Sequence, residues 1–137
     1  MKKQFVLLLG CMLGVLATVK AEEETPLGMQ MEAMDDAYKA FRRETDPEKG
    51  AALAREAQVA ALKAALETPA LVAEMPEGLE KVKAALVYRK MMAKVIMSLC
   101  EVEEAFIDGN IDEVAKIVDS LKSQKKEGHE KFIKEEE

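Results

Sequence analysis

The chain has 137 residues, of which 49% are hydrophobic, 34% are charged and only 4% are aromatic, and its formal net charge is −6 at pH 7. This length fits a single domain. An acidic chain without a basic patch is poorly suited to bind nucleic acid, although it could dock on a basic partner. The sequence offers no catalytic acid–base pair, nucleophile–histidine pair or phosphate-binding loop, so we do not expect an enzyme. Alanine, leucine, lysine, glutamate and methionine dominate, which favours an all-α fold.

Residues 1–21 have the pattern of a secretory signal peptide. Two lysines precede an apolar run, and Val19-x-Ala21 fits the small residues of a cleavage site. The run is too short to be a good transmembrane helix. We therefore expect cleavage after Ala21 and an exported domain over residues 22–137 with no membrane span. A second interpretation makes the chain a lipoprotein acylated at Cys11, and both remain open at this point.

Two helices are expected in the first half of the exported domain. Thr25, followed by proline, caps the first, whose apolar residues recur at helical spacing to an end near Arg43. Asp46, again followed by proline, opens the second in the same way. This second helix is rich in alanine and stops at Thr68, because the next residue is proline. A loop of about ten residues should follow, longer than a simple helix–helix turn.

The third helix is expected from about Leu79 to Ile107. Its larger apolar residues form a wide stripe: Leu79, Val82, Leu86, Met92, Val95, Ile96, Leu99, Val102 and Phe106. Cys100 is the only cysteine of the exported domain, and its apolar neighbours suggest a buried, inert residue. Gly109 suits a left-handed helix end. Asn110 then caps a fourth helix, which continues almost to the C-terminus.

Four amphipathic helices with short or moderate connections predict an up-down-up-down four-helix bundle. Its first and last helices would be antiparallel neighbours. Met31 and His129 would then lie at a matched depth, roughly 8 Å from the same end of the bundle. His129, the only histidine, shares a helix face with Ile111 and Val118, which directs it inward or to the edge of the core. A thioether and an imidazole facing each other are a known axial pair for haem iron.

Other interpretations of these residues remain open on spacing alone. A single histidine on an apolar face is often a hydrogen-bonded structural residue, and methionines often fill irregular gaps in a core. Met29, Met31 and Met34 could also bind a soft metal such as copper. Met29, however, lies about 200° around the helix from Met31, so those two would not share a face.

Three segments resemble the soluble periplasmic cytochrome b562 family. Residues 31–36 (MEAMDD) match its first helix, residues 88–92 (YRKMM) its third, and residues 108–132 align with its last helix without a gap. The resemblance implies that Met31 and His129 are the axial haem ligands. It also implies haem contacts from further residues: Met34, Tyr88, Met92, Lys125 and Phe132.

Three positions depart from the family pattern. Gly128 replaces an aromatic residue before the histidine, Met92 replaces an aromatic residue that would pack against the haem, and Lys125 stands where the family has an arginine. No Cys-x-x-Cys-His motif is present, so haem could not be attached through thioether bonds. Axial ligation and apolar burial alone would have to hold it.

The resemblance and the residues together predict a periplasmic b-type cytochrome. One non-covalent haem b per chain would be held by Met31 and His129. The protein would act as a monomer and transfer single electrons to a redox partner protein that the sequence does not identify. The alternative is a haem-free exported helical bundle that binds a protein partner or a soft metal.

Overall fold

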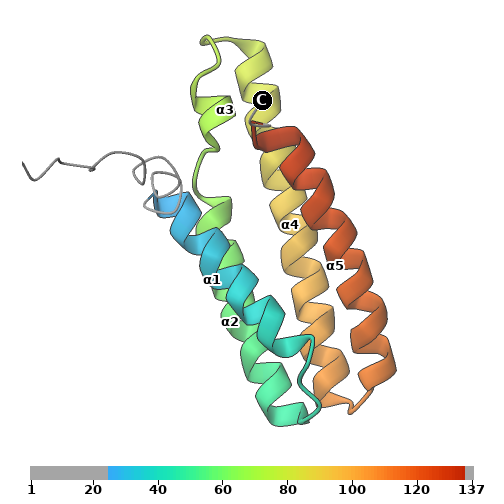
Figure 1. Ribbon diagram of the computed structural model, residues 1–137. Helices are drawn as coiled ribbons and strands as arrows, with labels where there is room; N and C mark the ends of the chain where they lie inside the picture. Colours follow the sequence, from blue (N-terminus) through green and yellow to red (C-terminus); the bar gives the residue numbers. More distant parts are fainter. Residues whose placement is uncertain (1–24, 135–137) are drawn as a thin grey trace, which may run out of the picture.

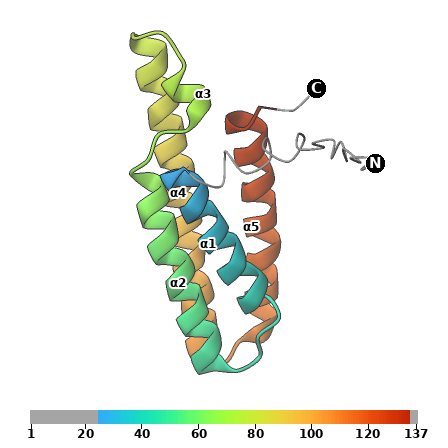
Figure 2. The ribbon, with the colours of Figure 1, turned by 60° about the vertical axis from the view of Figure 1, so that its left-hand side comes forward.

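The computed structural model describes residues 25–134, and this part of the chain contains helices and no strands. Four long helices run alternately up and down (Figures 1 and 2): α1 (Pro26–Phe41), α2 (Pro47–Ala65), α4 (Leu79–Ile107) and α5 (Ile111–Phe132). The predicted up-down-up-down four-helix bundle is confirmed. Within the described range, no helix has both the length and the hydropathy needed to cross a membrane. The predicted signal peptide (residues 1–21) and the alternative acylation site at Cys11 lie outside the described residues.

Local backbone chemistry sets the helix starts. The side chains of Thr25, Asp46 and Asn110 each accept a hydrogen bond from the backbone N–H three residues on, at 2.9, 2.9 and 3.1 Å. These bonds satisfy donors that the first helical turn leaves free. Between α4 and α5, Gly109 has a φ of 67°, a left-handed conformation that glycine adopts without strain. All three predicted caps are therefore confirmed.

The loop between α2 and α4 contains a one-turn helix, α3 (Ala70–Ala73). Val72 of α3 is buried, and Nζ of Lys81 in α4 donates a hydrogen bond to the carbonyl oxygen of Ala73 at 3.1 Å. The sequence pattern did not predict α3, because four residues are too few to show helical periodicity.

Small residues of α2 pack against large residues of α4 in the core. The buried face of α2 is mostly alanine, and the largest fully buried side chains of the bundle are Phe41, Leu99, Val102 and Phe106. Gly50 of α2 approaches Phe106 so closely that a Cβ atom added to it would lie 2.3 Å from the ring. Small side chains at this contact allow the two helices to come close together.

Part of the apolar stripe predicted for α4 faces outward. Leu79, Val82 and Leu86, all in the first half of the helix, are exposed. Cys100 is also exposed, so the prediction that it is buried was wrong. The cause is that α4 carries apolar residues on more of its circumference than its contacts with α2 and α5 cover.

Candidate functional site

The four long helices do not approach each other equally on all sides of the bundle. α1 packs on α2, α2 on α4 and α4 on α5, but no Cα atom of α1 lies within 8 Å of a Cα atom of α5. α1 and α5 run antiparallel, as predicted, and α1 starts toward the end of the bundle where α5 finishes (Figures 1 and 2). The bundle therefore has one open side, between its first and last long helices.

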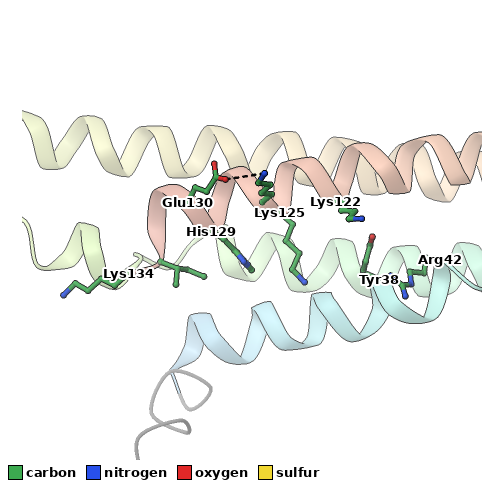
Figure 3. A pocket seen from close by; sticks show the side chains of 9 residues that line it. Tyr38, Arg42, Lys122, Lys125, His129, Glu130 and Lys134 are labelled. Atoms are coloured by element: carbon green, nitrogen blue, oxygen red, sulfur yellow. Dashed lines mark ion pairs between the residues drawn. The ribbon is translucent and has the colours of Figure 1, made fainter. Parts of the chain in front are cut away.

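An open cavity of about 620 Å³ occupies this side (Figure 3). Its volume falls within the range typical of small-molecule sites. Tyr38 and Arg42 line it from α1. The other lining residues come from α5 and the two residues after it: Lys122, Lys125, Lys126, His129, Glu130, Ile133 and Lys134. The cavity wall thus combines aromatic and aliphatic surface with a group of cationic side chains.

His129 lies at the open edge of the bundle, and its side chain is exposed. Figure 3 shows the imidazole projecting from α5 toward the first turns of α1. Among residues 25–134, no side chain donates a hydrogen bond to this imidazole or forms an ion pair with it. A histidine with a structural role normally has such a partner. This imidazole is therefore available to a ligand in the cavity.

Met31 is half-buried on α1 and packs against the hydrophobic core. It is not one of the cavity-lining residues. It lies seven residues before Tyr38, which places both on the same face of α1, and Figure 3 shows Tyr38 directed toward α5. The two predicted ligands, Met31 and His129, thus sit on the two helices that border the open side.

The other predicted apolar contacts belong to the core and not to the cavity wall. Met92 is buried, and Met34 and Phe132 are half-buried against the core. The hydroxyl of Tyr88 donates a hydrogen bond to the carbonyl oxygen of Ala64 at 2.6 Å. Its ring meets that of Phe132 edge-on, with ring centres 5.4 Å apart. Tyr88 therefore ties α4 to α2 and to α5.

Burial of the Tyr88 hydroxyl predicts a loss of stability at alkaline pH. Burial, with a smaller effect from Glu67, raises the pKa of Tyr88 to about 12. A raised pKa means that the stabilisation is complete below the unfolded-state pKa of about 10 and is lost as pH rises toward 12. Tyr88→Phe should lower stability by about 1 kcal/mol at neutral pH, because a hydrogen bond is lost. By about pH 11.5 the free energy of unfolding of the wild-type protein should have fallen by roughly 2 kcal/mol more than that of the variant.

Urea denaturation of both proteins at the two pH values measures this effect. The order of stability should reverse between neutral and alkaline conditions. An unchanged difference would show that folding does not raise the pKa of Tyr88.

An ion pair links α1 to α5 across the open side. Nζ of Lys125 lies 2.5 Å from Oδ1 of Asp35, and Nζ of Lys39 lies 2.7 Å from Oδ2 of the same carboxylate. Partial burial acts to raise the pKa of Asp35, but the hydrogen bonds from Lys125 and Lys39 outweigh it and hold that pKa below its usual value. The Lys125 side chain is 48% exposed and that of Asp35 is 25% exposed, so solvent screens the pair in part and its contribution to stability is modest.

Sequence reasoning predicted Lys125 at the site but missed other cationic residues. Lys122 of α5 and Lys134, two residues after α5, line the wall. Arg42, directly after α1, reaches it with its guanidinium carbon 5.9 Å from the Tyr38 ring centre. The spacing in sequence could have predicted Lys122 at the site, because Lys122 lies seven residues before His129 and therefore on the same face of α5. Arg42 lacked such a signal, because it follows the last turn of α1.

The structure does not support a clustered soft-metal site. Met29 is exposed, whereas Met31 and Met34 are half-buried against the core, so these three side chains do not converge. In the described part of the chain, no group of three or more histidine, cysteine, aspartate or glutamate residues could hold a metal ion. A thioether from α1 and an imidazole from α5 remain the soft donors beside the open side.

A four-helix bundle with an imidazole and a thioether on the two helices that border its open side has the donor types of a b-type haem site. A family model described as cytochrome b562 matches residues 26–133, and the chain belongs to this family. Its members are haem-binding electron carriers and not typically enzymes. No curated protein matches the chain.

The residues around the open side fit a haem group. The cavity lies between α1 and α5, and Met34 of α1 and Phe132 of α5 pack half-buried against the core. The free imidazole of His129 and the thioether of Met31 are a recognised donor pair for haem iron. The cationic side chains of the wall suit the carboxylates of haem, since lysine and arginine form strong charge-assisted hydrogen bonds with carboxylates.

Proposed function

We propose that the protein is a periplasmic one-electron carrier with one non-covalent haem b per chain, ligated by Met31 and His129. One observation carries this proposal. The only histidine presents an unpaired imidazole to the open side of the bundle, and the facing helix bears Met31. Membership of the cytochrome b562 family supports the same assignment.

The chain's own residues would supply ligation and burial. His129 would hold the haem iron through a ring nitrogen, and Met31 would hold it through its sulfur. Bound haem iron supplies the ferric–ferrous couple, and a Met/His axial pair raises its reduction potential. Apolar contact with Met34, Tyr38 and Phe132 would keep water away from the haem faces, since these side chains are already half-buried against the core.

The cationic wall would offset the negative charge of the haem carboxylates. Arg42, Lys122 and Lys125 surround the cavity, and Lys125 already holds a carboxylate, that of Asp35. Asp35 would keep its ion pair with Lys39, so Lys125 would exchange one anionic partner for another without leaving Asp35 unpaired. Lys125 could therefore turn from Asp35 to a haem carboxylate.

Attachment of haem would be non-covalent. Cys100 is the only cysteine among the described residues, it lies on α4, and no Cys-x-x-Cys-His motif exists in the chain. Thioether linkage to haem requires that motif. The haem should therefore be fully extractable into acidified organic solvent.

Haem titration of the protein purified after export tests the proposal. We expect saturation at one haem per chain, a low-spin six-coordinate visible spectrum and reversible one-electron reduction. The intact mass of the same sample separates cleavage after Ala21 from a lipid-modified Cys11. A protein that takes up no haem would instead favour the haem-free helical bundle.

A further inference from the structure

The outer face of α4 carries an apolar seam that the bundle leaves exposed. Its members recur every seven residues over the whole helix: Leu79, Leu86, Ala93, Cys100 and Ile107. Met97, which is 63% exposed, lies beside the seam at its middle. Such a repeat supplies one of the two apolar positions per heptad of helices that pair along their length, and Met97 adds an apolar residue beside it.

The charges of α4 are separated along the same helix. Its first half is basic, with Lys81, Lys83, Arg89, Lys90 and Lys94, and its second half is acidic, with Glu101, Glu103, Glu104 and Asp108. Glu80 is the one acid of the first half, and it pairs with Lys83 at 3.0 Å. Near the seam, Arg89, Lys90 and Glu104 form no ion pair with any other described residue. Lys81, Lys83 and Glu103 are paired within the chain. The charges left for a partner near the seam are thus basic in the first half of α4 and acidic in the second half.

We propose that this face binds a second copy of the chain, with the two α4 helices antiparallel. We place the two helices so that Ile96 of one copy is level with Met97 of the other. In this register every apolar seam residue from 86 to 107 lies opposite another apolar residue. Leu86 meets Ile107 of the second copy, and Ala93 meets its Cys100. The overlap is 22 residues, or roughly 33 Å of helix.

Electrostatics select this orientation. In the same register Lys90 of one copy lies on the same flank of the seam as Glu104 of the other and within one residue of its height, and the pair occurs twice because the contact is two-fold symmetric. A parallel pairing would place basic half on basic half and acidic half on acidic half, and like charges facing each other are destabilising. The small side chains of Ala93 and Cys100 also let the two helices approach closely.

α2 extends the apolar surface beside the seam. Val59, Leu62 and Leu66 are exposed along one face of α2. Two hydrogen bonds show which residues of α2 and α4 lie at the same height along the bundle. Gln58 Nε2 donates to the carbonyl oxygen of Leu99 at 3.2 Å, and Tyr88 Oη donates to the carbonyl oxygen of Ala64 at 2.6 Å. These bonds bring Leu62 level with the middle of the seam.

The proposed contact leaves the cavity free. Helices pack in the order α1, α2, α4, α5 around the bundle, so the α2–α4 side is opposite the open α1–α5 side. Two chains joined through α4 would stand back to back, with their cavities facing away from each other. The proposal does not depend on haem binding.

Sedimentation equilibrium of the purified protein over a range of concentrations tests the proposal. We expect a reversible monomer–dimer equilibrium. Met97→Lys should weaken dimerisation by at least about a hundredfold, because both copies lose an apolar contact and two like charges meet near the symmetry axis. Met29→Lys is the matched control, since Met29 is 57% exposed on α1, and it should leave the equilibrium unchanged. Unchanged helical circular dichroism would show that both variants fold.

Charge exchange tests the antiparallel register. Glu104→Arg alone should weaken the dimer, and Lys90→Glu in the same chain should restore it, because the two reversed charges again face each other. Oxidation of Ala93→Cys should also produce a covalent dimer through Cys100 of the second copy, and Cys100→Ser should abolish that product. The monomer expected from the sequence, present at every concentration, would overturn the proposal. So would a dimer that is indifferent to Met97→Lys.

Discussion

Replacing His129 by alanine is expected to convert the low-spin spectrum of the haem-loaded protein to a high-spin one. The iron would keep one protein ligand, so the pocket should still take up haem. Affinity should fall by at least about tenfold, since even the loss of an outer-sphere partner of a metal ligand has effects of that size. Visible spectroscopy and haem titration measure both changes.

Met31→Ala should also give a high-spin spectrum, and in addition it should lower the reduction potential. The thioether favours ferrous over ferric iron, so its loss removes that preference. Met29→Ala is the matched control, because Met29 is exposed and lies on another face of α1. It should change neither the spectrum nor the potential. A spectrum that is indifferent to both His129→Ala and Met31→Ala would show that other residues ligate the iron.

Gly50→Ala is expected to produce a large loss of stability. An added Cβ would lie 2.3 Å from the ring of Phe106, which is fully buried and cannot move without disturbing the core. Overpacking of this kind costs typically about 1–3 kcal/mol. The gain in helix propensity from replacing glycine with alanine, about 1 kcal/mol, would offset only part of it. Thermal unfolding should show a melting temperature lower by several degrees.

Gly128→Ala supplies the matched control for this prediction. Gly128 also lies inside a helix, but a Cβ there would lie 3.7 Å from Cε of Met91, an ordinary van der Waals distance. The same substitution should therefore raise stability by about 0.5–1 kcal/mol. Equal effects of the two substitutions would show that helix propensity, and not the contact between α2 and α4, decides both results.

The helix boundaries could be predicted from sequence because they depend on neighbouring residues. Thr25, Asp46 and Asn110 cap their helices through bonds to N–H groups three residues away, and such local chemistry is readable in the chain. Helix α3 escaped prediction because its four residues are held by contacts with α4 and not by a pattern of their own.

The candidate site could be predicted only in part. Helical spacing and antiparallel order brought Met31 and His129 to the two helices that border one side, since both follow from periodicity and topology. The width of that side could not be predicted. Periodicity gives the direction in which a residue points, but the distance to the next helix depends on how all the helices pack.

Cys100 shows the same limit in another place. Its apolar neighbours predicted burial, yet it is exposed, because an apolar neighbourhood in sequence extends around the whole helix and a core covers only part of it. Tyr88 is the opposite case. It lies in the core with its hydroxyl bonded to the carbonyl of Ala64, a long-range contact with no signal in the local sequence, and its haem contact stays a prediction.

The open side has a consequence for how the chain folds. The bundle consists of two helical hairpins, α1 with α2 and α4 with α5, which meet along α2 and α4. Contacts within each hairpin join segments that are close in sequence, and chains dominated by such contacts fold quickly. The two hairpins are therefore joined along one side of the bundle, by the α2–α4 contact, and are separate along the other. A group bound to both α1 and α5 would bridge the open side and hold the two hairpins together at the first and last helices of the bundle.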